Sequence, residues 1–250
     1  MSLQGKVALI TGAGRGIGRD YARGFAGDGA SLVVADIDES SAANVAAETR
    51  DAGVNSIAVG VDVADEASVD AMVEAAISHF GRVDILVNNA ALWGDLEIYP
   101  VCMTPTDYWN RVFAVNVNGA FLCSKALLPQ MRERKWGRIV NQSSAGAYMI
   151  PGGVYSITKL ALNGLTAHLA FECGIDSITV NGIAPGLIDT DASRKQVPEQ
   201  YRQMILQQTP TGRPGTGGDL YGMVRYLCSD EAAWVTGQTF MLNGGFMSRM

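Results

Sequence analysis

A glycine-rich segment near the amino end constrains the fold of this chain more than any other feature. The segment reads Thr11-Gly12-Ala13-Gly14-Arg15-Gly16-Ile17-Gly18, with a short apolar run before it and a stretch of helical periodicity after it. Glycines let the backbone turn sharply and let a ligand approach closely, and the start of the following helix offers free N–H groups and a partial positive charge. Strand, glycine turn and helix in this order predict a cradle for a pyrophosphate.

Short apolar runs alternate with amphipathic segments along the whole chain. We expect strands over 7–10, 31–35, 56–61, 85–88, 138–142, 179–183 and 240–242, and helices over 16–28, 39–52, 66–80, 104–133, 153–173 and 219–229. Runs that are apolar on both faces suit the strands of a buried parallel sheet, and the alternation indicates right-handed βαβ units. The sequence therefore predicts an α/β fold of the Rossmann type, a doubly wound, seven-stranded parallel sheet with helices on both faces.

No linker and no shift in composition divides the chain, so we expect a single dinucleotide-binding and catalytic domain over residues 1–250. The segment 189–216 is polar and contains Pro198, Pro210 and Pro214. It is too long for a simple connection, and long loops in compact domains often cover a binding site. We therefore expect a substrate lid at about 189–216.

Composition narrows the possible partners. Nineteen basic and twenty-five acidic side chains give a net charge of −6, so no basic surface for nucleic acid is expected. The amino end does not resemble a signal peptide, and no stretch approaches ~18 uninterrupted apolar residues, so we expect no membrane contact. Two His and no C-x-x-C make a metal site unexpected, and we expect a cytoplasmic protein with reduced thiols at Cys102, Cys123, Cys173 and Cys228.

Carboxylates follow the second and third predicted strands. Asp36, eighteen residues after Gly18, would accept hydrogen bonds from the hydroxyls of an adenosine ribose and would repel a 2′-phosphate. Arg15 favours NADP instead, because a cation beside the glycine turn could pair with that phosphate. We take Asp36 as decisive and predict NAD as the cofactor. Asp62 could accept from an adenine amine, although alone it would suit an ordinary turn equally well.

A tyrosine and a lysine lie one helical turn apart downstream. Tyr155 and Lys159, at positions i and i+4, share one helix face, and the preceding strand ends at two hydroxyls, Ser143 and Ser144. Hydride transfer at an alcohol carbon needs proton transfer at its oxygen, and a phenol with a pKa of ~10 becomes a usable base when a nearby ammonium lowers that pKa. Counting along the strand from Gly137 selects Ser144 to hold the substrate oxygen, whereas counting back from Gly146 selects Ser143; we favour Ser144.

Together these motifs resemble the short-chain dehydrogenase/reductase family in its single-domain form. The resemblance covers essentially the whole chain and rests on Thr11–Gly18, Asp36, Asp62, Asn88–Ala90, Asn116, Ser143/Ser144, Tyr155–Lys159 and Pro185-Gly186. Ala91 and Asn243 depart from it, since Gly and Asp are usual at these positions, and the interval from Ser to Tyr155 is short.

The resemblance implies roles for individual residues. Tyr155 would be the general acid/base, Lys159 would lower its pKa and bind the nicotinamide ribose, and Asn116 would hold a water in a proton relay. The backbone of Ile188 and the hydroxyl of Thr190 would bind the carboxamide. The expected catalytic residues are therefore Asn116, Ser144, Tyr155 and Lys159. The expected cofactor-binding residues are Gly12, Arg15, Gly16, Ile17, Gly18, Asp36, Ile37, Asp62, Val63, Asn89, Ala90, Tyr155, Lys159, Pro185, Gly186, Ile188 and Thr190.

The pocket is expected to be apolar. Its predicted walls are 91–96, 145–154 and 187–204, and the first two hold no Arg or Lys that an anionic substrate would need. Expected substrate contacts are Trp93, Ser144, Tyr148, Ile150, Tyr155 and Leu187. We thus predict an NAD-dependent oxidoreductase that interconverts an apolar secondary alcohol, alicyclic or aromatic, and its ketone. The alternatives are an NADP-dependent ketone or 3-oxoacyl reductase and a non-catalytic dinucleotide-binding protein.

Apolar residues surround much of the predicted helix 104–133 and fill 237–250, which indicates contacts between subunits. The resemblance implies a homotetramer.

Overall fold

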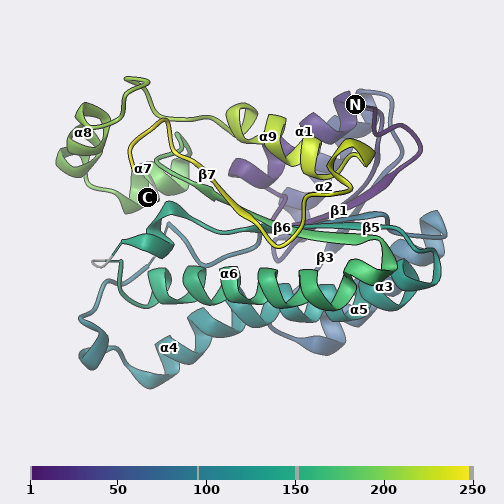
Figure 1. Cartoon of the computed structure of the whole chain (residues 1–250), viewed down its shortest axis with the longest axis horizontal. Helices are drawn as coiled ribbons and strands as arrows, with labels where there is room; N and C mark the ends of the chain where they lie inside the picture. Colours follow the sequence, from purple (N-terminus) through teal and green to yellow (C-terminus); the bar gives the residue numbers. More distant parts are fainter. Residues whose placement is uncertain (1, 95, 150–151, 248–250) are drawn as a thin grey trace.

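The computed structural model describes residues 2–94, 96–149 and 152–247. Within these ranges seven parallel strands form one sheet in the order β3-β2-β1-β4-β5-β6-β7 (Figure 1). The strands are β1 (Val7–Thr11), β2 (Ser31–Asp36), β3 (Ser56–Gly60), β4 (Ile85–Asn88), β5 (Gly137–Gln142), β6 (Ile178–Pro185) and β7 (Thr239–Leu242). The predicted fold class is confirmed.

The helices are α1 (Gly16–Gly27), α2 (Glu39–Asp51), α3 (Glu66–Phe80), α4 (Thr106–Phe113), α5 (Gly119–Glu133), α6 (Gly153–Cys173), α7 (Asp191–Gln196), α8 (Glu199–Gln207) and α9 (Gly217–Leu227). Single turns of 3-10 helix are η1 (Val101–Met103), η3 (Ala145–Tyr148), η5 (Gly174–Asp176) and η6 (Asp230–Ala232), and η2 (Ala114–Asn118) is a π turn. The helix predicted from 219 begins at Gly217, because Thr216 and Asp219 form a capping box there.

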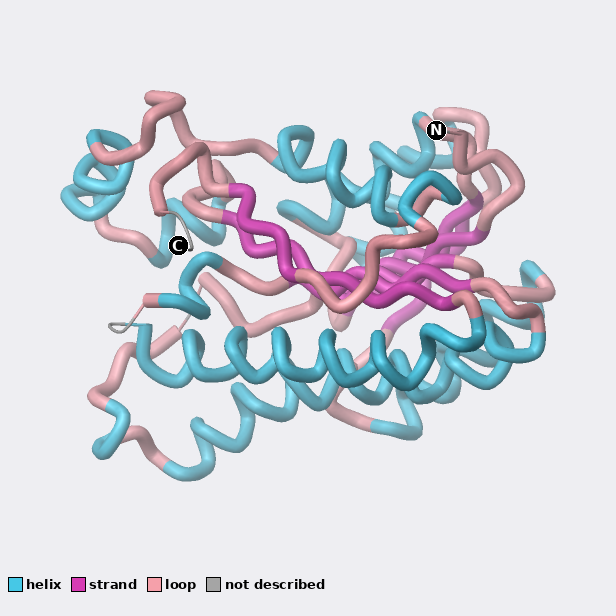
Figure 2. The backbone as a smooth tube through the Cα atoms, in the orientation of Figure 1, coloured by secondary structure: helices cyan, strands magenta, loops and turns pink. Residues whose placement is uncertain are grey.

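Helices cover both faces of the sheet (Figures 1 and 2). On one face Tyr21 and Phe25 of α1 lie in a core cluster with residues of α2 and α9. On the other face Met72 of α3 and Leu127 of α5 lie in a second cluster with residues of α6. The parallel strands are apolar on both sides because each side is buried under helices.

The strand order reverses between β1 and β4. From β1 the chain continues outward to β2 and β3, whereas from β4 it continues outward to β5, β6 and β7. Ligands of doubly wound sheets bind beyond the carboxyl ends of the strands at such a switch point. The segments that follow β1, β2, β4, β5 and β6 therefore meet at one edge of the sheet.

The predicted helix 104–133 is divided in the structure. It begins at Thr106, and the π turn η2 separates α4 from α5. By length and composition the continuous stretch Thr106–Glu133 could cross a membrane, with a mean hydropathy of 1.3 in its apolar window. That window is 44% buried inside the protein, and the core helix of an ordinary globular protein passes the same test.

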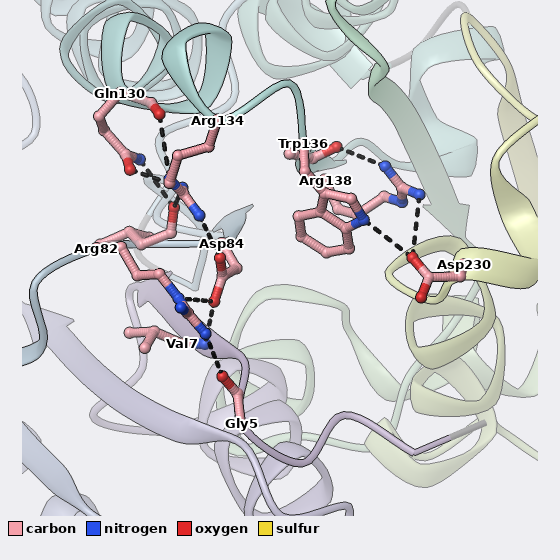
Figure 3. A network of polar contacts seen from close by, with 11 residues as sticks. Gly5, Val7, Arg82, Asp84, Gln130, Arg134, Trp136, Arg138 and Asp230 are labelled. Atoms are coloured by element: carbon pink, nitrogen blue, oxygen red, sulfur yellow. Dashed lines mark hydrogen bonds and ion pairs between the residues drawn. The ribbon is translucent and has the colours of Figure 1, made fainter.

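An ionic network lies at the amino ends of β1, β4 and β5 (Figure 3). Asp84 is 3% exposed and accepts hydrogen bonds from Arg82 at 3.1 Å, from Arg134 at 2.5 Å and from the N–H of Val7 at 2.9 Å. Beside it, the Trp136 indole donates to Asp230 at 2.9 Å. A buried carboxylate with two guanidinium partners holds the starts of β1 and β4 together.

The segment predicted as a lid, 189–216, is largely helical. It contains α7 and α8, and a parallel bridge joins Ile188 to Gly215 at its two ends. Asp189 accepts from both Arg194, at 3.0 Å, and Arg202, at 3.2 Å, which fastens both helices to the start of the segment. Sequence periodicity missed these helices because α7 has only six residues.

Candidate active site

The glycine turn after β1 is packed so closely that only glycine fits at two of its positions. Gly12 has a φ of +63°, and a Cβ there would lie 2.8 Å from Cα of Ala90. A Cβ on Gly18 would lie 2.2 Å from the carbonyl oxygen of Gly12. The Asn89 amide donates to the carbonyls of Thr11, at 3.0 Å, and Gly12, at 2.9 Å. Asn89 and Ala90 thus fix the shape of the turn from the end of β4.

The start of α1 is free to bind an anion. Arg15 is its N-cap and makes no capping hydrogen bond, and its first turn contains no acidic residue. A Cβ on Gly16 would have only one neighbour, Cγ2 of Thr190 at 3.9 Å, so space opens between the turn and the loop after β6. Free N–H groups beside open space fit the pyrophosphate of a dinucleotide. The exposed Arg15 side chain has no partner within the described ranges.

Asp36 lies at the carboxyl end of β2 and braces the glycine turn. Its carboxylate accepts from the N–H of Gly14 at 2.8 Å and from the N–H of Asp38 at 3.1 Å. A carboxylate has further acceptor positions, so these bonds leave room for a ribose hydroxyl. The neighbouring Ile37 is 74% exposed, an apolar surface suited to an adenine face. Asp62 is exposed and accepts from the N–H of Ala64 at 2.9 Å, while Val63 is buried.

Asn116 occupies the π turn between α4 and α5 and is 2% exposed. Its side chain accepts from the N–H of Leu92 at 2.7 Å and donates to the Thr158 hydroxyl at 3.2 Å. One amide therefore links the segment after β4 to α6. Isolated π turns inside α-helices frequently occur at functional sites.

The two candidate serines point in different directions. The Ser143 hydroxyl donates to the carbonyl of Lys159 at 3.3 Å, on the main chain of α6. The Ser144 hydroxyl accepts from the N–H of Gly146 at 3.0 Å and forms a hydrogen bond with the Tyr155 phenol. The structure thus brings Ser144, rather than Ser143, to the tyrosine.

Tyr155 and Lys159 share one face of α6, but their ionisation differs from the expected pattern. Burial raises the pKa of Tyr155 to about 12, against which the hydrogen bond with Ser144 acts. Burial lowers the pKa of Lys159 to about 8. The Lys159 ammonium donates to the carbonyl of Gln142 at 2.7 Å and lies 5.7 Å from the centre of the Tyr155 ring. Burial thus shifts the pKa of the phenol upward, in the opposite direction to the depression expected from a neighbouring ammonium.

The predicted substrate residues are not all gathered at Tyr155. The Trp93 ring lies on the Tyr155 ring, with centroids 4.7 Å apart and an interplanar angle of 37°. Leu187 is half-buried in the loop after β6. The Tyr148 hydroxyl accepts from Asn163, two helical turns along α6 from Tyr155, and so points away from it. Ile150 lies outside the described residues.

The loop after β6 carries the predicted nicotinamide contacts. Gly186, which follows Pro185, is packed against Asn243, whose Cβ would lie 2.8 Å from an added Cβ. The Ile188 side chain is buried in the core, and its carbonyl accepts from the N–H of Thr190 at 3.0 Å. The Thr190 hydroxyl caps α7 by accepting from the N–H of Ser193 at 3.1 Å.

Several supporting contacts of the site carry no signal in the sequence. The Thr11 hydroxyl accepts from the N–H groups of Asn89 and Ala90, each at 3.1 Å. The amide of Gln142 accepts from the Tyr21 hydroxyl at 2.8 Å, which fixes the residue whose carbonyl holds Lys159. These partners lie far apart along the chain, and only the folded structure brings them together.

The chain is similar to known oxidoreductases over nearly its whole length. A family profile described as enoyl-(acyl carrier protein) reductase matches residues 12–247. An uncharacterized oxidoreductase of Mycobacterium tuberculosis is 44% identical over 244 residues, 98% of both chains. A 3-oxoacyl-[acyl-carrier-protein] reductase of Pseudomonas aeruginosa is 40% identical over 247 residues, also 98% of both chains. A solved 7 alpha-hydroxysteroid dehydrogenase complexed with NADH and 7-oxo glycochenodeoxycholic acid has a TM-score of 0.93 and 38% identity, covering 98% of this chain and 95% of that one.

Proposed function

The chain belongs to the short-chain dehydrogenase/reductase family, and on that premise we propose that it is an NAD-dependent enzyme that interconverts an apolar secondary alcohol and its ketone. The observation that carries the proposal is the meeting of Tyr155 with Ser144 and Lys159 at the edge of the sheet where the carboxyl ends of the strands lie, the edge that also carries the glycine turn. Two of the relatives support it, since the names of both describe the interconversion of a hydroxyl group and a ketone.

Tyr155 is the proposed general acid and base. In alcohol oxidation its phenolate takes the hydroxyl proton as the alcohol carbon loses a hydride, and in reduction the phenol returns that proton to the ketone oxygen. A bound nicotinamide supplies the hydride acceptor or donor. The Ser144 hydroxyl holds the substrate oxygen near the phenol. Lys159 stays an ammonium below pH about 8, and its charge favours the phenolate.

The dinucleotide would be held by groups on three loops and on α6. The N–H groups at the start of α1 would bind the pyrophosphate, Asp36 the adenosine ribose and Lys159 the nicotinamide ribose. The backbone of Ile188 and the hydroxyl of Thr190 would bind the carboxamide. Both polar ends of the Asn116 side chain make hydrogen bonds, and Asn116 would hold a water of the proton relay from its place in the π turn.

Charges around the adenosine site favour NAD over NADP. Asp36 would repel a 2′-phosphate, and Glu48 already neutralises Arg19 at 2.5 Å and Arg23 at 3.0 Å. Arg19 and Glu48 line a hollow of about 460 Å³ between α1 and α2 that begins at Gly14. Arg15, at the start of α1, makes no ion pair among the described residues. Fluorescence titration with NADH and NADPH tests this, and tighter binding of NADPH would overturn the cofactor assignment.

The substrate is proposed to be a neutral alicyclic or aromatic secondary alcohol. Trp93 and Leu187 support an apolar pocket. The test is a panel of neutral alcohols, carboxylated alcohols and 3-oxoacyl thioesters, followed at the absorbance of the reduced cofactor. A preference for carboxylates would contradict the proposal, and a preference for 3-oxoacyl thioesters with NADPH would favour the 3-oxoacyl reductase alternative instead.

The Tyr155→Phe variant tests whether Tyr155 transfers the proton, since it keeps the ring and removes the hydroxyl group. We expect a rate loss of ~10²- to 10⁴-fold with unchanged NADH affinity. Ser144→Ala should lose most activity and Ser143→Ala little, and the reverse result would exchange their roles. NADH binding without turnover of any substrate would indicate a non-catalytic dinucleotide-binding protein.

We also propose a cytoplasmic homotetramer. Large apolar side chains stand out from the surface near the end of α6 and before β7: Phe171 is 90% exposed, Ile175 89% and Trp234 98%. Exposed apolar groups of this size are typical of surfaces covered by another subunit. Light scattering at micromolar concentration tests this, and a monomeric mass would refute it.

A further inference from the structure

A glutamine side chain joins α7 to the segment after β4 that carries Trp93. The amide oxygen of Gln196, at the end of α7, accepts from the N–H of Leu96 at 2.9 Å. The amide nitrogen of Gln196 donates to the carbonyl of the same Leu96 at 3.0 Å. The Gln196 amide thus bonds both the N–H and the C=O of Leu96, as the main chain of a neighbouring strand would do. The two residues are a hundred positions apart in the chain.

A second contact joins the same two segments. Gly94 has a φ of +97°, and a Cβ there would lie 3.0 Å from Cβ of Ala192 in α7. The segment 92–94 and 96–98 therefore lies close against α7, and the absence of a side chain at Gly94 permits that approach. One residue earlier, the Trp93 ring covers the Tyr155 ring with centroids 4.7 Å apart.

We propose that Gln196 is a positioning residue whose amide holds the segment that carries Trp93 over Tyr155, so that Trp93 forms a wall of the substrate site. The inference rests on the proposed function, because it assigns to Trp93 a contact with the substrate ring. Gln196 itself touches no reacting group and acts through Leu96 and Trp93.

The cavity beside Tyr155 is much smaller than a cyclic substrate. The cavity lined by Leu96, Val154 and Tyr155 has a volume of about 10 Å³, room for about one water molecule. Because the Trp93 ring lies on the Tyr155 ring, a cyclic substrate that reaches the phenol would lie against the indole. Stacking or edge contact between rings contributes ~0.5–1.5 kcal/mol, equivalent to roughly 2- to 12-fold in affinity.

The position of Trp93 can be tested without turnover. The chain has four Trp residues, so the Trp93 signal is taken as the difference between a protein and its Trp93→Phe counterpart. In Gln196→Ala we expect acrylamide to quench Trp93 at least twofold more strongly than in the wild type. The matched control is Gln203→Ala, since that amide, in α8, donates only to Glu199 of the same helix at 2.6 Å.

Steady-state kinetics test the consequence for the substrate. Gln196→Ala should raise KM for a cyclic alcohol by roughly 2- to 12-fold, with kcat less affected, and should leave KM for 2-propanol unchanged. Gln196→Glu keeps the acceptor for the Leu96 N–H but places a carboxylate against the Leu96 carbonyl, so it should not rescue binding. Gly94→Ala, which pushes the segment away from Ala192, should reproduce the loss from the opposite side.

Outcomes that overturn the inference differ from those that overturn the function. Unchanged quenching in Gln196→Ala refutes the role of Gln196, and increased quenching with unchanged KM for the cyclic alcohol refutes the role of Trp93. If Gln196→Ala does not fold, Gly94→Ala decides by the same two measurements. A wild-type protein that oxidises no alcohol refutes the proposed function, while the quenching experiment still tests the contact between Gln196 and Leu96.

Discussion

Replacing Lys159 by Met should stabilise the folded protein at neutral pH while abolishing the proposed chemistry. Lys159 is 2% exposed, and burial lowers its pKa from 10.5 to about 8. A change of this size corresponds to a cost of about 3 kcal/mol for keeping the charged form in the folded protein. Met has a similar length and no charge, so the variant avoids that cost. The Gln142 carbonyl loses its donor, which costs about 1 kcal/mol. The net gain in unfolding free energy at pH 7 is about 2 kcal/mol.

The gain should disappear as the pH rises. The unfolded chain keeps the Lys159 proton up to pH 10.5, whereas the folded chain releases it near pH 8. Wild-type stability contributed by this group therefore rises between these two values. At pH 10 the charged Lys159 still costs the wild type about 1 kcal/mol. The variant loses a similar amount because the Gln142 carbonyl has no donor, so the two proteins should be about equally stable.

Urea unfolding at one protein concentration, at pH 7, 8, 9 and 10, measures the difference between the two proteins. Lys125→Met is the control, because Lys125 is 58% exposed and pairs with the exposed Glu66. We expect its effect to stay below about 1 kcal/mol throughout. A Lys159→Met protein that is less stable than the wild type at pH 7, or a difference that does not shrink by pH 10, would refute the reasoning.

Two further substitutions test the packing of the glycine turn and the stability of the network around Asp84. Gly18→Ala should lower the unfolding free energy by about 1–3 kcal/mol and weaken NADH binding, because its Cβ would lie 2.2 Å from a carbonyl oxygen of the same turn. Gly27→Ala, in the same helix with nothing within 4 Å, should be neutral or stabilising by up to ~1 kcal/mol in the same unfolding assay. Asp84→Asn should cost about 3–5 kcal/mol in denaturant unfolding, since it leaves two guanidinium groups without a counter-charge. Glu66→Gln, at an exposed pair, should cost less than ~1 kcal/mol, and equal losses at both sites would contradict this account.

The fold could be predicted because its signals are local. Each strand is a short apolar run, and each long helix shows its own periodicity, so the strand–helix alternation and the glycine turn identify the architecture without knowledge of distant contacts. The same is true of Tyr155 and Lys159, which share a helix face by spacing alone.

The rest could not be predicted because it depends on contacts between distant segments. The π turn at Asn116 lies in a sequence whose pattern suits a continuous helix. The pKa of Tyr155 is raised because the phenol is buried, and part of that burial comes from Trp93, which lies on another loop. The bond between Gln196 and Leu96 joins two segments with no complementary signal in either. The choice between Ser143 and Ser144 depends on how the chain turns after β5, which counting residues left open.

The network around Asp84 lies at the opposite edge of the sheet from the reactive groups, and this separation affects how the protein can evolve. The ends of β1 and β4 that bear Asp84 and Val7 are anchored by charge, whereas the other ends of these strands carry the loops of the proposed site. Substitutions in the loops of the proposed site can thus alter substrate preference without loosening the scaffold. Mutations in the anchor would instead reduce the amount of folded enzyme and leave its selectivity intact.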